Sequence, residues 1–216
     1  MERICEPELM DDAEQARAYA EADFSAGDRA LLDRMEELFG PHLGPRIIDL
    51  GCGPGNISFL LAERHAAARV LGIDGAPAML AIAAARLQAA PARWPTLSFQ
   101  HMLLKPGGAL PEEGRWTAVI SNSLLHHLHD PLVLWQAVRR LAAPGAAVCI
   151  KDLRRPVDAA ALEALVQRHA AGAPPVLRRD YAQSLRAAFG CQEVEAQLQQ
   201  AGLEGLVVRE LDDRYL

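Results

Sequence analysis

Cysteines are few in this chain, and their spacing contains no Cys-x-x-Cys pair. The 216 residues include only Cys5, Cys52, Cys149 and Cys191. Such scattered cysteines are typical of reduced, mostly buried thiols, so we expect a cytoplasmic protein. No apolar run approaches the ~20 residues of a membrane helix, so we expect no membrane span. The opening Met1-Glu2-Arg3-Ile4 soon becomes acidic and is unlike a signal peptide.

The chain also lacks any run of lysines or arginines. It has 22 basic and 28 acidic residues, which give a net charge of −6. Tight binding to a nucleic-acid backbone needs a basic face, so this composition disfavours a nucleic-acid partner. Half of the residues are hydrophobic and 23% are charged, which suits an α/β domain with a sizeable core.

A short apolar run leads into a glycine-rich turn at residues 47–56, with the sequence Ile47-Ile48-Asp49-Leu50-Gly51-Cys52-Gly53-Pro54-Gly55-Asn56. The three glycines at alternate positions let the backbone approach a ligand closely, at the start of a predicted helix. A second acidic residue, Asp74, follows the apolar run 70–73. Together the two features predict a nucleoside-binding pocket at the carboxyl edge of a parallel sheet.

Two other nucleotide-binding patterns are missing from this turn. A nicotinamide-binding fold would show Gly-x-Gly-x-x-Gly with its third glycine at position 56, where this chain has Asn56. A phosphate loop would need Gly-x-x-x-x-Gly-Lys followed by Ser or Thr, which is absent. The turn therefore indicates a nucleoside ligand of another kind.

Strands alternate with helices over most of the chain. After the first strand, which ends at Leu50, we expect strands at 70–73, 97–100, 116–121 and 146–151. This alternation predicts a doubly wound, Rossmann-like α/β sheet, mostly parallel, with helices on both faces. The rhythm changes after Asp152, where we expect helices at 156–171, 177–188 and 191–201 and then a closing antiparallel β-hairpin.

We expect residues 1–216 to form a single domain with four parts. Residues 1–44 supply N-terminal helices that could serve as a lid, and 45–152 form the cofactor-binding core. Residues 153–202 form a variable helical cap for the substrate, and 203–216 form the hairpin.

Three segments resemble the motifs of one enzyme family. Asp49-x-Gly51-x-Gly53-x-Gly55 resembles motif I of class I S-adenosylmethionine-dependent methyltransferases, in the small-molecule branch with the ubiquinone and menaquinone methyltransferases (type 11). Gly72-Ile73-Asp74-x-x-Pro77-x-Met79-Leu80 resembles the second motif, and Ser121-Asn122-x-Leu124-Leu125-His126-His127-Leu128-x-Asp130-Pro131 resembles the segment after strand four. The resemblance covers roughly residues 45–152 and is specific for the cofactor, but weak for the acceptor.

The resemblance implies that S-adenosylmethionine is the cofactor. Asp49 would orient the turn and reach the methionine amino group, Asp74 would hold the ribose, and backbone N–H groups of the turn would face the methionine carboxylate. Asn122 would lie next to the methyl group. The implied cofactor residues are Asp49, Gly51, Cys52, Gly53, Gly55, Asn56, Asp74, Gly75, Met79, Met102 and Asn122.

The chain departs from the family pattern just after the third strand. The family usually has an acidic residue there to hold the adenine amino group, but this chain has Phe99-Gln100-His101-Met102. We expect Met102 to pack on the adenine face, with a backbone or His101 contact to the ring edge. The alternative is that the cofactor is held loosely.

Three histidines follow the fourth predicted strand. On a helix, His126 and His129 would share a face with Asp130, but local spacing ties no further carboxylate or cysteine to them, so we expect no metal site. We instead take His126 or His127 as the candidate catalytic base for an acidic acceptor proton. Alternatively the histidines only line the surface and alignment supplies the acceleration, because the family does not require a base.

Arginines gather in the expected substrate region. Arginine binds carboxylates and phosphates through a planar fork, so these residues predict an anionic acceptor. The alternative is a solvated arginine face paired with Asp152 and Asp180. The candidate substrate contacts are Tyr19, Arg154, Arg155, Arg179 and Tyr181, with Arg178 in the same cluster.

These features predict methyl transfer from S-adenosylmethionine to a small molecule. One alternative is an NAD(P)-dependent reductase, against which Asn56 and the lack of a second substrate domain argue. Another is a catalytically silent S-adenosylmethionine-binding regulatory subunit, supported only by the missing adenine carboxylate. The sequence leaves open whether oxygen, nitrogen, carbon or sulfur accepts the methyl group, and it leaves open the oligomeric state.

Overall fold

The computed structural model describes residues 1–216, which form two compact units. The sheet unit comprises Met10–Asn122 and Ala137–Ile150, and the helical unit comprises Met1–Leu9, Ser123–Gln136 and Lys151–Leu216. The expected boundary between the cofactor core and the helical segment at residue 152 therefore lies within two residues of a boundary between units. The expectation of a single domain over 1–216 stays a prediction.

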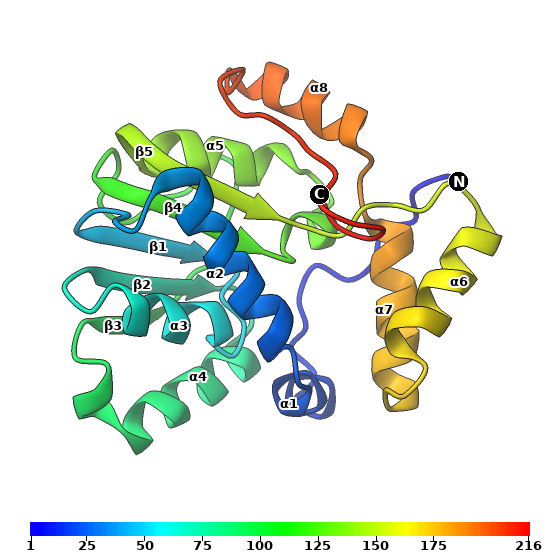
Figure 1. Ribbon diagram of the computed structural model, residues 1–216, viewed down its shortest axis with the longest axis horizontal. Helices are drawn as coiled ribbons and strands as arrows, with labels where there is room; N and C mark the ends of the chain where they lie inside the picture. The colour runs from blue at the N-terminus through cyan, green and yellow to red at the C-terminus, as the bar shows by residue number, and fades with distance from the viewer. The chain divides into compact units, whose positions relative to one another are not determined.

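Five strands form one sheet in the order β3-β2-β1-β4-β5 (Figure 1). They are β1 (Arg46–Leu50), β2 (Arg69–Asp74), β3 (Leu97–His101), β4 (Trp116–Asn122) and β5 (Ala142–Lys151). The pairs β1–β2, β1–β4 and β2–β3 are parallel, and β5 points the same way as β4. The strand order reverses between β1 and β4, which confirms the predicted doubly wound α/β fold.

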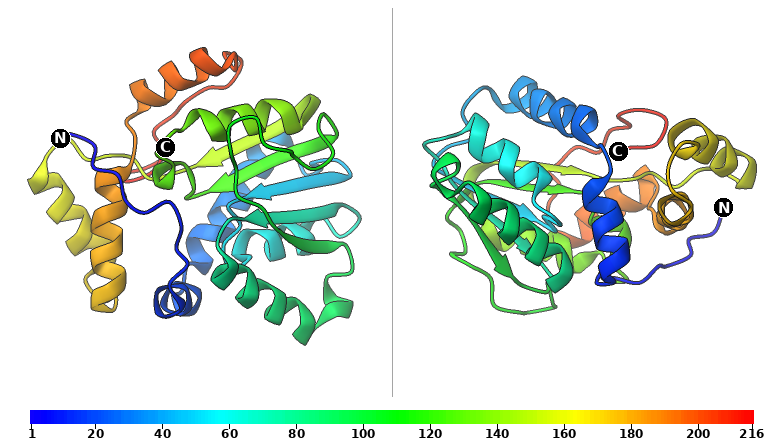
Figure 2. Two further views of the ribbon diagram at one scale, coloured as in Figure 1. Left: turned by 180° about the vertical axis from the view of Figure 1, so that it is seen from behind. Right: turned by 90° about the horizontal axis from the view of Figure 1, so that it is seen from below.

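Helices cover both faces of the sheet (Figure 2). The helices α2 (Ser25–Phe39), α3 (Asn56–Arg64) and α4 (Pro77–Ala89) lie on one face, and α5 (Leu132–Leu141) lies on the other. This is the arrangement that right-handed crossovers impose, because the chain moves outward from β1 to β3 and then returns through β4 to β5. Before α2 comes α1 (Ala13–Glu21), and the short 3₁₀ helix η1 (Pro91–Arg93) precedes β3.

The main core of the sheet unit lies between the sheet and the helices α2 and α3. Leu31, Leu32 and Met35 of α2 are almost fully buried because apolar residues at this helical spacing share one face, whereas Leu38 is exposed. They pack in one cluster with strand residues such as Ile47 and Val70. Burial of each such side chain contributes ~1.5–3 kcal/mol relative to exposure, so this cluster fixes the sheet on which the strand ends are arranged.

The helical unit has its own apolar cluster. After the 3₁₀ helix η2 (Leu125–His127), it contains α6 (Ala159–Ala170), α7 (Pro175–Ala187) and α8 (Cys191–Ala201). Asp158 caps α6, because its side chain accepts a hydrogen bond from Ala161 N. The buried residues of this cluster are Leu153, Leu162, Leu165, Val166, Leu185 and Ala188.

The predicted C-terminal hairpin is not confirmed, because residues 203–216 contain no β-strand. The end of the chain pairs instead with the segment that follows β5. Tyr215 forms an isolated antiparallel bridge with Leu153, and the backbone groups of Leu216 and Asp152 exchange two hydrogen bonds. None of the helices has the length and apolar character that crossing a membrane would need.

Candidate cofactor and acceptor site

Parallel pairing brings the carboxyl ends of three strands to one edge of the sheet unit. Leu50 at the end of β1 pairs with Ile73 of β2 on one side and with Ser121 of β4 on the other. The residues that follow these positions are the glycine turn, Asp74 and Asn122. This is the edge at which open α/β sheets bind ligands, next to the point where the strand order reverses.

The glycine turn needs its glycines for two different reasons. Gly51, Gly53 and Gly55 all have positive φ, at 69°, 53° and 87°, a region that side chains disfavour. A Cβ at Gly55 would lie 2.8 Å from the Phe99 ring, so this glycine allows close packing inside the unit. A Cβ at Gly53 would meet nothing within 4 Å, so Gly53 borders open space where a ligand can approach the backbone.

The N–H groups of the turn already have partners within the chain. Gly51 N and Cys52 N both donate to Ile73 O, Gly55 N donates to Cys52 O, and Gly53 N donates to Asp74. These four N–H groups are therefore engaged within the chain in this arrangement, and their contact with the methionine carboxylate stays a prediction. The first turn of α3, which follows the glycine turn, offers N–H groups with no intrahelical partner.

Asp74 ties the end of β2 to the glycine turn. Its Oδ2 accepts a hydrogen bond from Gly53 N at 2.8 Å, and its Oδ1 accepts one from Ala76 N at 2.7 Å. Burial raises the pKa of Asp74, while these backbone donors act in the opposite direction. A carboxylate has about four lone-pair sites, so two backbone hydrogen bonds leave acceptor capacity for a ligand hydroxyl.

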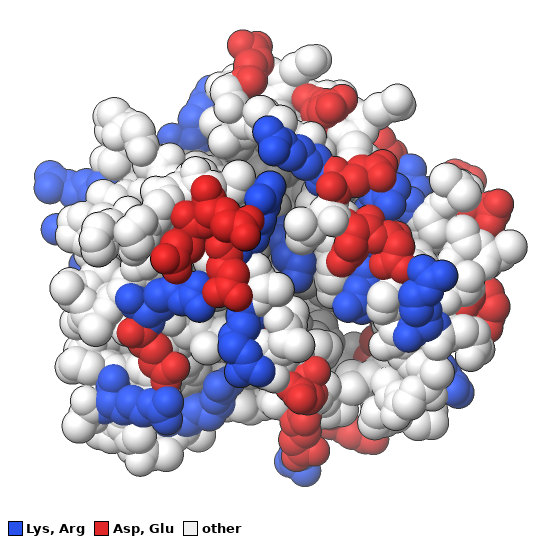
Figure 3. Space-filling model, in the orientation of Figure 1, with Lys and Arg blue, Asp and Glu red and all other residues white.

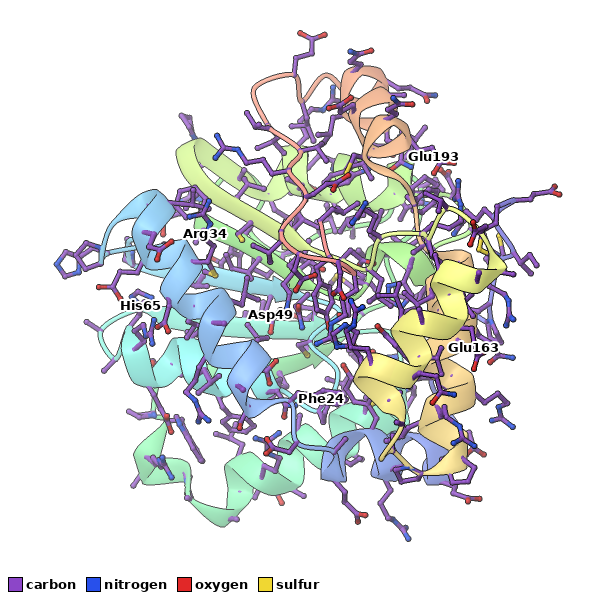
Figure 4. All side chains as sticks on the ribbon, turned by 45° about the vertical axis from the view of Figure 1, so that its right-hand side comes forward. Phe24, Arg34, Asp49, His65, Glu163 and Glu193 are labelled. Atoms are coloured by element: carbon purple, nitrogen blue, oxygen red, sulfur yellow. The ribbon has the colours of Figure 1, made fainter.

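Asp49 is the most deeply buried carboxyl group of this edge. It lies in β1 within the sheet unit (Figure 4) and is only 1% exposed. Its Oδ2 accepts a hydrogen bond from Ser58 Oγ at 2.6 Å. Burial raises the pKa of Asp49 to about 7, with Asp74 adding to the shift. Burial disfavours the charged form of this carboxyl group, so a cation that binds beside it would stabilise the carboxylate strongly.

Asn122, at the end of β4, carries a buried oxygen that the chain leaves without a partner. Its Oδ1 makes no hydrogen bond, although buried polar atoms are nearly always paired. The pairing of Leu50 with Ser121 places Asn122 beside the start of the glycine turn. An unpartnered acceptor at a strand end fits a site that a polar ligand completes, and the residues present therefore fit the implied cofactor.

Three implied cofactor residues have clear packing roles. Asn56 Oδ1 accepts a hydrogen bond from Arg86, which also donates to Pro54 O and so holds the turn closed. Met79 is buried in a cluster beneath α1. Burial raises the pKa of Cys52 well above its usual range, so this thiol stays protonated and is a poor nucleophile. Their contact with the cofactor stays a prediction.

The end of β3 lies beside the end of β2, as the adenine end of the site requires. Met102 N donates to Asp74 O at 2.8 Å, and His101 Nε2 lies 3.1 Å from Gly75 O. Met102 is half-buried and His101 is exposed. These positions agree with a Met102 side chain on the adenine face, which no contact here tests.

Tyr19 packs within the sheet unit. It joins the cluster of Ala16, Ala76 and Met79, and its ring lies 4.8 Å from that of Phe24. The N-terminal helix α1 is thereby attached to α4. A substrate contact of Tyr19 stays a prediction.

A shared face for His126 and His129 would require a helix that includes both residues, and the structure does not have one. The 3₁₀ helix η2 is a single turn that ends at His127. His126 is only 2% exposed, whereas the His129 side chain is 55% exposed and its Nε2 lies 2.8 Å from Glu6 O. The His126–His129–Asp130 face is therefore not formed.

His126 lies between two carboxyl groups of the helical unit. Its Nδ1 is 2.5 Å from Asp152 Oδ1, and its Nε2 is 3.5 Å from Glu6 Oε1. Burial opposes the charged ring, but Asp152 and Glu6 outweigh it and raise the pKa of His126. Sequence reasoning placed Asp152 only as an arginine partner and missed Glu6, which no local spacing links to the histidines.

His127 lies on the other side of Glu6. Its Nδ1 is 3.2 Å from Glu6 Oε1, and its side chain is 12% exposed. Burial and the neighbouring His126 lower the pKa of His127 well below its usual range, so this ring is neutral. Burial likewise raises the pKa of Glu6.

The candidate arginines have different surroundings. Each nitrogen of Arg155 has a partner within the chain, namely Met1 O, Ala188 O and Glu193, which gives this residue a structural role. Arg179 has a side chain that is 66% exposed and pairs with Asp180. Arg178 and Arg179 line an open groove of about 480 Å³ between α6 and α7.

Arg154 and Tyr181 keep buried polar atoms without partners. Arg154 pairs with Glu210 at 3.0 Å, but its Nε and the Tyr181 hydroxyl make no hydrogen bond. Burial raises the pKa of Tyr181, while the neighbouring Arg214, which sequence reasoning missed, acts in the opposite direction. Arg214 also has a buried, unpartnered Nε. Arg154 N donates to Arg214 O, so backbone pairing brings the two arginines together. Basic and acidic side chains are otherwise interspersed on the face that Figure 3 shows.

Comparison with known proteins agrees with this geometry. The sheet order and the strand-end site define a Rossmann-like α/β architecture. Residues 47–145 match the family model described as a methyltransferase domain. Over 118 residues, the chain is 36% identical to a trans-aconitate 2-methyltransferase of Methylobacterium radiotolerans, a match covering 51% of this chain and 39% of that one. It is 30% identical to a ubiquinone biosynthesis O-methyltransferase of Paracidovorax citrulli, covering 68% and 59%.

Solved structures show the same fold. A SAM-dependent methyltransferase from Aquifex aeolicus superposes with a TM-score of 0.64 at 18% identity, covering 94% of this chain and 95% of that one. A Haemonchus contortus phosphoethanolamine N-methyltransferase 2 in complex with S-adenosylhomocysteine gives 0.64 at 20% identity, covering 88% and 41%. Over residues 47–145 this chain is similar to class I S-adenosylmethionine-dependent methyltransferases, and the matching Haemonchus contortus structures are complexes with S-adenosylhomocysteine or S-adenosylmethionine. The chain spans about half the length of the curated relatives it matches.

Proposed function

We propose that this chain transfers a methyl group from S-adenosylmethionine to a small, anionic acceptor. The observation that carries the proposal is the junction of strand ends in the sheet unit. There Gly53 borders open space and Asn122 Oδ1 is buried without a partner. S-adenosylmethionine supplies an electrophilic methyl group on a sulfonium centre.

The residues of the sheet unit bind and orient the cofactor. Asp74 accepts the ribose hydroxyls with the lone pairs that Gly53 N and Ala76 N leave free. The N-terminus of α3 faces the methionine carboxylate, and Asp49 attracts the methionine ammonium group. Asn122 Oδ1 accepts a hydrogen bond beside the methyl group. Alignment of the two reacting atoms supplies much of the rate acceleration.

The anionic character of the acceptor is supported by the helical unit. Arg154 Nε, Arg214 Nε and the Tyr181 hydroxyl are buried polar atoms without partners, and each can donate a hydrogen bond to a carboxylate. The trans-aconitate in the name of several relatives is itself a carboxylate. We do not include Arg155 among the proposed acceptor contacts, because its nitrogens already have partners within the chain.

The role of the histidines depends on whether the Glu6 carboxyl group is protonated. As a base, His126 has the orientation it needs, since Asp152 holds its Nδ1. Its other nitrogen faces Glu6 Oε1, so a proton taken up there would be shared with that carboxylate. His126 or His127 as the base stays a prediction.

Several finer expectations rest on the sequence alone. The net charge of −6 and the absence of basic runs disfavour a nucleic-acid partner. A cytoplasmic location rests on the four scattered cysteines. A catalytically silent subunit would bind the cofactor without turnover, and a reductase would bind NADH.

Turnover assays on a panel of acceptors test this proposal. We expect S-adenosylhomocysteine to form with carboxylate acceptors, trans-aconitate among them, and not with their methyl esters. Arg154→Lys and Arg214→Lys keep the charge but lose the fork, so each should raise the KM for the acceptor about tenfold or more. Arg209→Lys, an exposed neighbour in sequence, is the matched control. Cofactor binding without turnover on any acceptor would indicate a silent subunit, and turnover on neutral acceptors alone would overturn the anionic acceptor.

A further inference from the structure

Three ligand atoms converge in the helical unit at a point where no hydrogen bond joins them. They are Glu6 Oε1, His126 Nε2 and His127 Nδ1, and all lie within 4.8 Å of one another. Glu6 Oε1 is 3.5 Å from His126 Nε2 and 3.2 Å from His127 Nδ1. Glu6 Oε1 and His127 Nδ1 are both buried without a hydrogen-bond partner. Buried polar atoms left facing one another in this way need an explanation.

The positions of the protons on the two imidazole rings determine which nitrogen atoms present lone pairs toward Glu6. Asp152 accepts hydrogen bonds from Leu125 N and Leu153 N, so it is an acceptor for His126 Nδ1–H as well. The backbone of Pro7, whose only polar group is a carbonyl, favours a protonated His127 ring, and because Nδ1 has no hydrogen-bond partner we assign the ring proton to Nε2. In neutral rings, His126 Nε2 and His127 Nδ1 therefore both present lone pairs toward Glu6.

We propose that Glu6, His126 and His127 bind a divalent metal ion of the zinc class. Tetrahedral Zn²⁺ holds nitrogen and oxygen ligands at ~2.0–2.1 Å, which places pairs of ligand atoms ~3.3–3.4 Å apart. The two separations from Glu6, 3.2 Å and 3.5 Å, fall on either side of this value. A single ion between the three atoms would satisfy every lone pair that the chain leaves unpartnered at this point.

The surroundings of the three ligands are those of a built metal site. Asp152 holds the second nitrogen of His126, the carboxylate–histidine–metal arrangement that fixes a ring and strengthens it as a ligand. Ser184 Oγ donates to Glu6 Oε2 at 3.2 Å, so the second oxygen of that carboxylate is also held. Arg3 donates to His126 O and Leu128 O, which anchors the N-terminal segment beside the 3₁₀ helix η2.

Ligand type and number set the class of ion and the character of the site. Two imidazoles and one carboxylate favour Zn²⁺, Co²⁺ or a related transition metal over Mg²⁺ or Ca²⁺, which prefer oxygen ligands. Three protein ligands leave a fourth tetrahedral position for water or for an anionic group. In this arrangement the histidines act as ligands, so neither ring is free to serve as a base.

Metal content measured on the untagged chain tests the proposal. After treatment with a chelator and reloading with Zn²⁺, we expect one ion per chain by mass spectrometry of the metal. We also expect Co²⁺ to give the intense visible absorption of a four-coordinate site, and Mg²⁺ in excess to displace neither ion. Glu6→Gln keeps the volume and the Ser184 contact, and it should weaken Zn²⁺ binding at least tenfold, as should His127→Ala. Asp152→Asn should weaken it about 10–100-fold by disturbing the ring of His126.

His129→Ala is the matched control, because His129 lies in the same run but its side chain is 55% exposed and outside the cluster. We expect its Zn²⁺ affinity to equal that of the parent chain. If the parent binds no Zn²⁺ above the level of Glu6→Gln, the metal site is absent and the cluster is a hydrogen-bonded network. Equal binding by the parent and by a folded His127→Ala would also overturn it, since the ion would then lie elsewhere. None of these measurements depends on methyl transfer.

Discussion

Buried carboxyl groups give the sheet unit a pH-dependent stability. The pKa of Asp49, about 7, lies well above the ordinary value of ~3.9, chiefly because the group is buried. The folded chain therefore holds a proton at pH values where the unfolded chain has lost it. By linkage, this group lowers stability progressively as pH rises from ~4 to ~7, and the full loss is present above that range.

We expect Asp49→Asn to remove this pH dependence. The substitution keeps the shape of the side chain and an acceptor for Ser58 Oγ, but it removes the charge. Relative to the parent, the variant should gain up to ~2.5 kcal/mol more stability at pH 8 than at pH 5, at 1.36 kcal/mol per pKa unit. Urea unfolding of the two chains without cofactor measures the difference. An equal stability difference at both pH values would show that Asp49 is already charged in the folded chain, and Asp33→Asn, an exposed carboxylate, is the control.

The glycines of the turn should separate into a packing position and a binding position. Gly55→Ala places a Cβ 2.8 Å from the Phe99 ring at a φ of 87°, so we expect a loss of ~2–4 kcal/mol in unfolding free energy. Gly53→Ala meets open space, so it should cost only ~1–2 kcal/mol for its positive φ while weakening S-adenosylmethionine binding at least tenfold. Thermal unfolding and calorimetry on both variants check this. Equal effects on stability and binding would contradict the division.

At the residue scale, the sequence predicted positions better than it predicted contacts. Asp49, Asp74 and Asn122 could be placed at strand ends because strands and turns are local patterns. The pairing of Asp74 with Gly53 N could not, because it depends on the register of two strands. Glu6 gave no signal, since its meeting with His126 depends on how a distant N-terminal segment packs.

At the scale of elements, the helix α1 is attached to α4 by few interactions. Asp12 caps α1, and Asp11 Oδ1 accepts a hydrogen bond from Ala78 N in the first turn of α4. Beyond these, a small cluster around Ala16 and Met79 holds the two helices together. A helix held in this way should open more readily than α2, whose inner face is buried in the main core.

We expect Asp11→Ala to loosen α1 without affecting α2. Loss of the hydrogen bond to Ala78 N should cost about 1 kcal/mol and raise amide hydrogen exchange in α1 about fivefold. Asp23→Ala is the matched control, because Asp23 Oδ1 accepts from Ser25 N at the start of α2. Unchanged exchange in α1 would mean that apolar packing alone holds it, and a rise spread over the whole sheet unit would mean that α1 opens only with the rest.

Elements with strong periodicity agreed with the structure, and irregular ones did not. The helix α8 (Cys191–Ala201) has the predicted bounds. The hairpin prediction was wrong because the only bridge that residues 203–216 form is the isolated pair Leu153–Tyr215, which leaves no alternating pattern in the sequence. A longer helix through the histidine segment does not form, because Ser123, with a φ of 61°, turns the chain before η2. A positive φ at a residue other than glycine has no reliable signature in the sequence.

At the scale of the whole molecule, each proposed role falls within one unit. The cofactor residues belong to the sheet unit, and the histidine cluster and acceptor arginines belong to the helical unit. The change of rhythm after Asp152 lies within two residues of one boundary between the units, but the sequence did not indicate that residues 1–9 and 123–136 belong to the helical unit. The pairing of the two chain segments within the helical unit, residues 1–9 with 151–216, could not be predicted, because nothing local links them.

Calorimetry with S-adenosylhomocysteine on the parent chain and on Asp74→Ala tests the central claim most directly. We predict that the parent binds S-adenosylhomocysteine and does not bind NADH. The folded Asp74→Ala chain should bind it more weakly by ~1.5–3 kcal/mol, because a charge-assisted contact to the ribose is lost. Asp33→Ala, an exposed carboxylate variant in α2, should bind like the parent. Binding of NADH in place of S-adenosylhomocysteine, or unchanged affinity in a folded Asp74→Ala chain, would contradict the account of this site.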